Sequence, residues 1–450
     1  MLAGMEESTL PGMESFKASE SDSAGAPAVE VDSLRFRRPD RAQARIVPCM
    51  LDETISPDHR VRLVWDLVEK LDLSGFAAGL KVQEGKAGRS ATDVGLLVAL
   101  WLWASTEGVG SARELERLCE EKDSYRWLCG GVDVNYHTLS DFRVDHEKAL
   151  DELLTTVLAT LMDQGLVKVR RISQDGMRVR ANAGAGSFRR RKTLEQRLAD
   201  AQKQVELLKS QREAQAGPSS SRGQKAARKR AAEERVRKAG AALEALAEVE
   251  KIRKEAKGGT NSKRPPRAST TDGEARVMKM GDGGFRPAYN VQLASDTESR
   301  AIVGVSVTNS GSDRALSEPM RQEVESRMDG KVEEHLMDGG FVNFDQLGQA
   351  ELEGVTVYAP PQASKKADPY QVRPTDTAEV ANWRRRMATE EAKTIYKERA
   401  ATSETVNADL RTYRGLDRFV VRGLAKVKCV ALWSALAYNL MHFGKALLMG

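Results

Sequence analysis

Two aspartates, each followed directly by glycine, are the first residues in this sequence that suggest chemistry. Asp175 lies in the stretch SQDGMRVRANAG, and Asp338 lies in LMDGGF. Asp-Gly is the commonest hairpin-turn dipeptide, so a plain turn remains open for each pair taken alone. A carboxylate at a strand end, beside glycines that permit close approach, can instead face an open cleft. Such oxygen ligands suit Mg²⁺ and Mn²⁺, and two ions held by two or three acids support phosphodiester chemistry.

A third acid, Glu404, stands in the stretch YKERAATSETVNADLR. At about 100° per residue, this stretch predicts an uninterrupted helix that gathers polar side chains on one arc. The members of the arc are Tyr396, Glu404, Asn407 and Arg411, with Arg399 at its edge. The carboxylate can hold a metal ion while the cations hold phosphate. An exposed helix with ordinary ion pairs is the alternative, and this stretch alone leaves it open.

Two further sets of arginines are candidates for contact with a phosphate backbone. Arg178 and Arg180 alternate with the apolar residues after Asp175, so they are predicted on the opposite strand face, as edge or DNA-backbone cations. Arg384, Arg385 and Arg386 form a run after Trp383, which suits phosphate binding. Trp383 would either stack on a flipped base or pack inside the protein. Asp272 and Asp313 are read mainly as turn residues that could assist the site.

The elements that must position these residues form a mixed pattern of strands and helices. After the strand that holds Asp175, the pattern predicts a hairpin of two strands, then a helix, a strand ending in LMDGGF, a helix, a short strand and a mainly helical stretch. The corresponding segments are 285–296, 301–310, 313–327, 334–338, a helix starting near 343, 355–361 and 376–411. This order predicts an α/β domain whose mixed sheet is flanked by helices.

The net charge of +5 over 450 residues is unevenly distributed. Residues 189–264 contain 22 Lys/Arg against 10 Asp/Glu, so this segment carries all of the excess positive charge. Apolar residues recur at helical spacing on either side of GPSSSRG, which predicts a basic helical hairpin of coiled-coil character, inserted into the surrounding domain. A polyanion such as nucleic acid is one partner that fits; a solvated charged helix is the alternative.

Composition divides the chain into five predicted parts. They are a disordered tail (1–35), a helical N-terminal DNA-binding domain (36–165), a catalytic domain (166–188 and 268–411), the basic insertion (189–267) and a C-terminal helical segment packed on the catalytic core (412–450). Another kind of small helical domain fits 36–165 equally well by pattern alone. Within it, Ser111 and Glu114 predict a capping box at a helix start.

The sequence also favours one cellular setting. Its 4 cysteines lack metal-type spacing and indicate reduced thiols in an intracellular protein. The first residues have no signal-peptide pattern. The longest apolar stretch, 429–441, is too short to cross a bilayer, so no membrane partner is expected.

Taken in order, these motifs resemble the DDE transposases of bacterial insertion sequences. DGMRVRANAG resembles the first-Asp motif, LMDGGF the second, and YKERAATSETVNADLRTYRGLDRFVVRGLAKVK the Tyr-Arg-Glu-Lys signature around the third acid. The resemblance spans roughly residues 36–445 and assigns Asp175, Asp338 and Glu404 as the triad. Four residues separate Arg399 from Glu404 where the common signature has three, and Arg411 stands where Lys is usual. Glu398 is the rival third acid.

The resemblance implies an RNase H-like catalytic core that holds two Mg²⁺ or Mn²⁺ ions on the three acids. It implies cleavage of an element's terminal inverted repeats and their joining to target DNA, by a homodimer or larger assembly on double-stranded DNA in the bacterial cytoplasm, associated with the nucleoid. Tyr396, Arg399, Arg411 and the run Arg384–Arg386 would contact DNA. A catalytically inactive DNA-binding derivative and a coiled-coil interaction protein are the alternatives.

Overall fold

The computed structural model describes residues 49–78, 90–213, 219–255, 265–362 and 368–449. The chain divides into residues 1–49 and 50–450. The predicted tail, 1–35, lies outside the described residues. All of the elements below belong to the second part.

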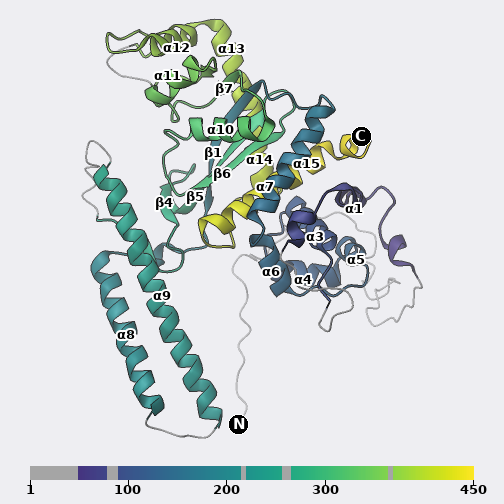
Figure 1. Cartoon of the computed structure of the whole chain (residues 1–450), viewed down its shortest axis with the longest axis vertical. Coiled ribbons are helices and arrows are strands. Elements are labelled where there is room, and N and C mark those ends of the chain that lie inside the picture. The colour runs from purple at the N-terminus through teal and green to yellow at the C-terminus, as the bar shows by residue number, and fades with distance from the viewer. Residues whose placement is uncertain (1–48, 79–89, 214–218, 256–264, 363–367, 450) are drawn as a thin grey trace, which may run out of the picture. The chain divides into compact units, whose positions relative to one another are not determined.

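A mixed six-stranded sheet forms the centre of the fold (Figure 1). Its strands are β1 (Arg171–Arg180), β4 (Arg276–Lys279), β5 (Phe285–Asp296), β6 (Ile302–Thr308), β7 (Glu334–Leu336) and β8 (Thr356–Tyr358). The order is β4-β5-β1-β7-β8, and β6 pairs with β5. β5 pairs antiparallel with β4, β1 and β6, whereas the β1–β7 and β7–β8 pairs are parallel. The predicted β5–β6 hairpin is confirmed, and the arrangement is consistent with an RNase H-like fold.

Burial along the strands explains why this sheet forms. β5 is buried at ten consecutive positions from Pro287 to Asp296, as expected for a central strand covered on both faces. In β1 the apolar residues Met177 and Val179 are buried while Arg180 is exposed. A strand with this alternation can have only one register without turning its apolar side chains to water.

Helices follow the strands in sequence. Those after β6 are α10 (Ser317–Met328), α11 (Phe344–Leu352), α12 (Ala378–Ala388), α13 (Glu390–Arg399), the π-helical segment η4 (Ala400–Glu404) and α14 (Thr405–Thr412). The last helix, α15 (Leu424–Met449), is buried at almost every position from Val427 to Leu440. It contacts β6 as well as helices before the sheet, so it lies between the two halves of the core.

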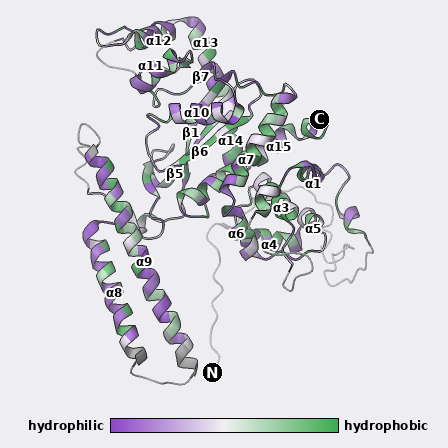
Figure 2. Cartoon of the chain, viewed as in Figure 1, coloured by the Kyte–Doolittle hydropathy of each residue, from purple (hydrophilic) through white to green (hydrophobic). Residues whose placement is uncertain are grey.

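A helical unit precedes the sheet and packs on α15. Its elements are η2 (Leu51–Thr54), α1 (Arg60–Lys70), α2 (Ser74–Ala77), α3 (Val94–Thr106), α4 (Ala112–Glu121), α5 (Asp123–Cys129), α6 (Tyr136–Val144) and α7 (Glu147–Asp163). α3 is apolar all round, and ten of its residues are buried, which makes it the centre of this unit (Figure 2). Among the described residues, no helix is both long enough and apolar enough to span a membrane.

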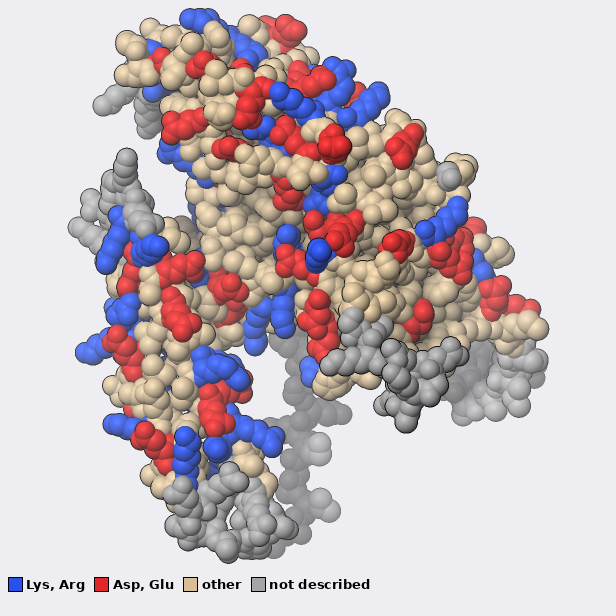
Figure 3. Space-filling view, in the orientation of Figure 1, with Lys and Arg blue, Asp and Glu red and all other residues tan. Residues whose placement is uncertain are grey.

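Two long helices stand between β1 and β4 in the chain. They are α8 (Arg191–Glu213) and α9 (Ser219–Glu255), flanked by η3 (Ala185–Ser187), β2 (Phe188–Arg189) and β3 (Ala268–Ser269). Arg191 pairs with Glu250, and Arg235 bonds to Gln204, so the helices run antiparallel. Their surface mixes both charge signs (Figure 3), because many of the basic side chains have acidic neighbours one turn away.

Candidate active site

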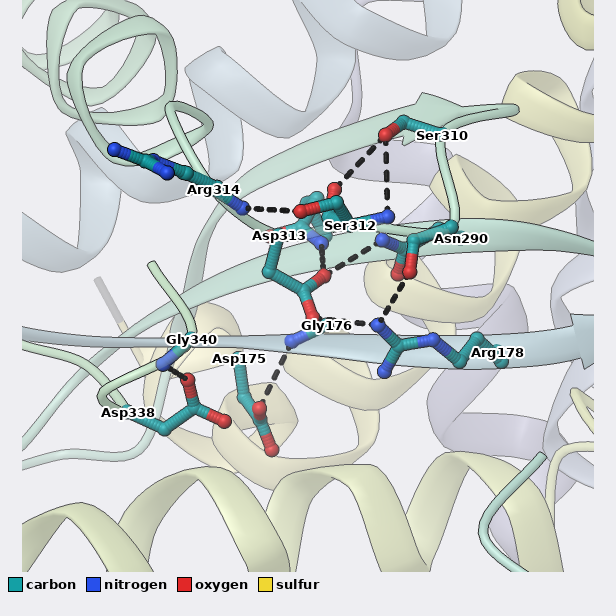
Figure 4. Close-up of polar contacts among 12 residues, drawn as sticks. Asp175, Gly176, Arg178, Asn290, Ser310, Ser312, Asp313, Arg314, Asp338 and Gly340 are labelled. Atoms are coloured by element: carbon teal, nitrogen blue, oxygen red, sulfur yellow. Dashed lines mark hydrogen bonds and ion pairs between the residues drawn. The ribbon is translucent and has the colours of Figure 1, made fainter. Parts of the chain in front are cut away.

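Asp175 and Asp338 lie side by side because of the register between β1 and β7. The two strands are parallel, and Ser173 is opposite Leu336, so each aspartate stands two residues beyond a paired position. Figure 4 shows both carboxylates on the same side of β1. The Asp175 side chain is only 19% exposed. Burial raises the pKa of Asp175, and the guanidinium of Arg399 opposes that rise.

Close packing requires the glycines beside the aspartates, and Gly339 also lies in a turn that the N–H of Phe341 closes onto the carbonyl oxygen of Asp338. Asp175 and Gly176 lie inside β1, paired with Leu293 and Gln292 of β5, so the hairpin-turn alternative is wrong for this pair. A Cβ on Gly176 would lie 2.4 Å from an oxygen of Asp313. A Cβ on Gly339 would lie 2.7 Å from the carbonyl oxygen of Pro360. Both positions therefore require glycine because another chain segment approaches closely.

The helix that carries Glu404 is interrupted, contrary to the sequence-based prediction. α13 ends at Arg399, five residues adopt π geometry, and α14 begins at Thr405. In an α-helix, residues five apart stand about 140° apart around the axis, whereas a π turn closes from i to i+5. The extra residue between Arg399 and Glu404 is thereby absorbed, and their side chains remain neighbours, with Nη1 3.8 Å from Oε1.

Several contacts fasten this helix to β1. The hydroxyls of Ser173 and Ser403 are 2.5 Å apart in the buried interface. Asn407 donates to Oδ2 of Asp175 at 3.0 Å, and Arg399 lies 3.2 Å from Oδ1 of the same carboxylate. Arg399 thus reaches both Asp175 and Glu404. The Glu404 side chain is 66% exposed, so the third acid faces outward and is linked to Asp175 through Arg399.

The two remaining members of the predicted arc border the same site. Tyr396 is partly buried near Arg399; burial raises the pKa of its hydroxyl, and the nearby carboxylates of Asp338 and Asp175 add to the rise while Arg399 opposes it. Arg411 is exposed, and its Nη2 donates to the carbonyl oxygen of Arg178 at 3.4 Å. Its charge is therefore available at the rim of the site.

The oxygen donors fit a hard divalent cation, although the acids are not gathered around one point. Within the described ranges, no three His, Cys, Asp or Glu side chains are close enough to hold an ion as they stand. Instead, the guanidinium of Arg399 supplies positive charge between Asp175 and Glu404. Its Nε is buried without a hydrogen-bond partner. Asp175, Asp338 and Glu404 offer only oxygen ligands, the set that Mg²⁺ and Mn²⁺ prefer.

A buried polar network behind Asp175 was not anticipated from the sequence. Asn290 and Gln292 of β5 donate to Oδ1 of Asp313 at 2.7 and 2.9 Å, and Arg178 pairs with its Oδ2 at 2.6 Å. Figure 4 shows the network on the side of β1 opposite Asp175. Polar residues at alternate positions of a buried strand were the available signal. The network fills the space that Gly176 leaves open.

Most of the arginines predicted to contact DNA are engaged inside the protein. Arg178 is held by Asp313, which corrects its reading as a DNA-backbone cation, whereas Arg180 remains exposed while it pairs with Asp417. Arg384 is 2% exposed and bonds to Asp376 and to the carbonyl oxygen of Pro369.

Two of the neighbours of Arg384, Trp383 and Arg386, are likewise engaged within the fold. Arg386 is held by Glu351, and Trp383 is fully buried, so neither phosphate contact by Arg386 nor base stacking by Trp383 fits this structure. Arg385 is exposed and donates to Asn382. Glu398, the rival third acid, pairs with Arg171 at 2.7 Å.

Comparison with known protein families gives two matches. Residues 361–443 match the transposase DDE domain, a range that includes the Glu404 helix and most of α15. Residues 50–145 match the transposase domain DUF772, which covers the helical unit through α6. No curated protein and no solved structure matches the chain. The two family matches flank the sheet that carries Asp175 and Asp338.

Proposed function

This chain belongs to the DDE transposases of insertion sequences, and from that premise we propose that it binds the terminal inverted repeats of its element, cleaves the ends and joins them to target DNA. The observation that supports this most is the placement of Asp175, inside β1, beside Asp338, two residues beyond the end of the parallel strand β7, on the side of β1 that faces the helix of Glu404. Carboxylates from three separate elements are what metal-dependent phosphodiester transfer requires.

Asp175, Asp338 and Glu404 would hold two Mg²⁺ or Mn²⁺ ions. Bound there, the ions would supply activation of the attacking oxygen and charge stabilisation at the phosphate. The protein's own contribution is positional, because β1 and β7 fix two carboxylates in register and the Ser173–Ser403 contact fixes the helix against them. Glu404 is exposed and approaches from a different element, so its movement toward the aspartates would complete the site.

The cations around the acids would orient the DNA backbone. Arg399 pairs with Asp175 in this structure. With metal ions bound to the acids, its guanidinium would be free to pair with a phosphate oxygen. Arg411 and Arg385 are exposed and could add phosphate contacts, while Tyr396 borders the site. Arg384 and Arg386 take no part in this proposal, because their charges are used within the fold.

The helical unit and the α8–α9 pair would hold the ends of the element. Transposition joins two ends, so a homodimer or larger assembly on DNA, in the bacterial cytoplasm at the nucleoid, is the expected working form. The antiparallel helices offer either a second DNA-binding surface or a contact between protomers. Deleting 190–264 and measuring DNA affinity and assembly mass separately would distinguish these two roles.

Cleavage of a labelled duplex end in Mg²⁺ tests the proposed function. Asp175→Ala should abolish cleavage while DNA affinity stays within about threefold, because one carboxylate is lost from the site and no DNA-facing cation is removed. Asp282→Ala is the matched control, since Asp282 is an exposed turn residue paired with Arg286. Normal cleavage by Asp175→Ala would refute the assignment. DNA binding without any cleavage by the unmodified chain would identify it as an inactive DNA-binding derivative.

A further inference from the structure

A polar cavity outside the three-acid site lies where the helical unit meets the segment that follows α14. Its volume is about 290 Å³. A water molecule occupies ~30 Å³ in the liquid, so the cavity has room for a phosphate group and several waters. The side chains that line it include Ser111, Arg113, Tyr136, Ser140, Arg143 and Val420.

Arg143 is a buried cation without an anionic partner. The residue is only 6% exposed, and its Nη1 donates to the carbonyl oxygen of Gly110 while its Nε has no partner in the described part of the chain. No carboxylate among the described residues forms an ion pair with it. Its guanidinium lies over the ring of Trp101, 4.6 Å from the centroid, which offsets part of the desolvation. Burial lowers the pKa of Arg143 to about 10.

A buried charge is costly unless an opposite charge or sufficient hydrogen bonds compensate it. Other deeply buried arginine side chains of this fold have such partners: Arg321 pairs with Glu325 and Glu353, Arg327 with Asp151 and Glu323, and Arg384 with Asp376. Arg143 therefore departs from the pattern of its own protein. An anion arriving from outside would supply the missing partner.

The start of α4 contributes a second source of positive potential to the same cavity. Ser111 is the N-cap of this ten-residue helix, and its side chain accepts from the backbone N–H of Glu114. The first N–H groups of a helix and its dipole favour a bound anion. The predicted capping box is incomplete, since the carboxylate of Glu114 bonds to Arg117 instead. The carboxylate of Glu114 is thus neutralised by a cation of its own helix and does not occupy the free N–H groups at the helix start.

Arg113 and Tyr136 form the outer wall of the cavity. The Arg113 guanidinium lies over the Tyr136 ring, 4.7 Å from its centroid, and the residue is exposed. The stacked ring limits the directions in which the guanidinium can point. Glu116 is the nearby acid, and it accepts the backbone N–H of Tyr136 at 3.0 Å. Arg113, Arg143 and the helix start together outweigh this single carboxylate.

The cavity is connected to the three-acid site through the chain that follows Glu404. A Cβ on Gly415 would lie 2.6 Å from the carbonyl oxygen of Gly108, so the segment after α14 touches the loop before α4 directly. Val420 continues that segment into the cavity wall. The end of β1 also reaches this segment, because the backbone N–H of Arg180 donates to the carbonyl oxygen of Asp417 and the carbonyl oxygen of Arg180 accepts from the N–H of Phe419.

We propose that this cavity, which we call the Arg143 pocket, binds one backbone phosphate of double-stranded DNA. A buried guanidinium without an anionic partner, a helix N-terminus and an exposed stacked arginine converge there, and all three suit a phosphodiester oxygen. The inference rests on the proposed function, since it adds a phosphate contact to a DNA-binding protein. The pocket would hold the duplex at the junction between the helical unit and the catalytic domain.

Anisotropy titrations of a labelled 30-base-pair duplex, in EDTA at several NaCl concentrations, test the proposal. Each phosphate contact contributes about 0.9 to the slope of log K against log salt. Arg143→Met and Arg113→Gln should each lower that slope by about one. At the same salt concentration, Arg143→Met should weaken DNA binding by about tenfold and Arg113→Gln by about threefold. Arg117→Gln is the control, because Arg117 lies on the same helix with its charge already paired to Glu114 and Glu121.

The apo protein provides a readout that separates this role from a structural one. Replacing an unpaired buried guanidinium by methionine should leave the thermal midpoint without DNA unchanged or higher. Unchanged salt slopes in both variants, with the parent chain binding DNA normally, would overturn the pocket and leave the proposed function intact. If Arg143→Met does not fold, the slope of the exposed variant Arg113→Gln decides. Absence of any DNA binding by the parent chain would instead contradict the proposed function itself.

A second arm distinguishes DNA from a free anion. Inorganic phosphate at 20 mM, compared with chloride at equal ionic strength, is added to the parent chain and to Arg143→Met. Stabilisation of the parent alone, together with the slope change on DNA, supports a phosphodiester site. Stabilisation of the parent by phosphate with unaltered DNA binding in the variants would show a site for a small free anion and overturn the proposal.

Discussion

Deleting Ala401 is the sharpest test of how the Glu404 helix is built. Ala401 is an exposed residue inside the π-helical segment η4. If this segment is a single-residue insertion into an α-helix, its removal restores the i→i+4 pattern. Arg399 and Glu404 would then be separated by three residues and stand about 40° apart around the axis, still on one face. The residues of α13 and α14, on either side of η4, would keep their present packing.

The same deletion elsewhere in this helix has a different consequence. Ala408 of α14 is also exposed, but it lies between the buried residues Val406 and Leu410. Removing it rotates one side of the helix against the other by about 100° and shifts it by about 1.5 Å. One of the two apolar side chains must then leave its pocket, at a cost of about 2–5 kcal/mol.

Urea denaturation of the two deletion variants measures the difference. We expect loss of Ala401 to change the free energy of unfolding by less than about 1 kcal/mol, with an unchanged m-value, and loss of Ala408 to cost several times more. Equal destabilisation by both deletions would refute the reading of η4 as an absorbed insertion. The variant lacking Ala408 also serves as the control for the general effect of shortening this helix.

Three further predictions concern single side chains. His335 is buried on β7, and desolvation lowers its pKa to about 3. The contribution of His335 to the free energy of unfolding is therefore complete above about pH 6.5 and falls by up to ~1.4 kcal/mol per unit as the pH decreases below that value, because the unfolded chain takes up a proton. His335→Leu should flatten this slope in urea titrations between about pH 4 and 7. Gly176→Ala should lower the free energy of unfolding by about 1–3 kcal/mol because its Cβ collides with Asp313, and an unaltered urea midpoint would contradict the packing described for β1. Arg384→Gln should lower the free energy of unfolding by about 3 kcal/mol, whereas Arg385→Gln should leave the free energy of unfolding unchanged and weaken DNA binding. Weaker DNA binding by Arg384→Gln without loss of stability would instead identify Arg384 as a DNA contact.

The strand and helix order was predictable because the apolar periodicities of this sequence are strong. The alternation in β1, the turn between β5 and β6, and the glycine after Asp338 each indicate local structure directly. Together they predict a mixed sheet, and the parallel register of β1 and β7 then places Asp175 next to Asp338. The interruption at η4 was not foreseen, although the extra residue between Arg399 and Glu404 was its signal.

The partners of the charged residues were less predictable, because they come from distant parts of the chain. Arg178 meets Asp313 only after β1 has paired with β5 and the following loop has folded back. Arg384 meets Asp376 eight residues earlier, across a turn and a helix start, and loses its exposure as a result. A run of arginines looks alike in sequence whether it faces water or the interior. The unpaired charge of Arg143 is likewise visible only from its surroundings.

A crystal structure with Mn²⁺ and a DNA end, read by anomalous scattering, tests the central claim most directly. The account predicts Mn²⁺ in contact with Asp175 and Asp338, with Glu404 completing the ligands and Arg399 withdrawn from Asp175 toward a phosphate. Mn²⁺ held by Glu398 in place of Glu404, or Asp175 still paired with Arg399 at saturating Mn²⁺, would contradict it.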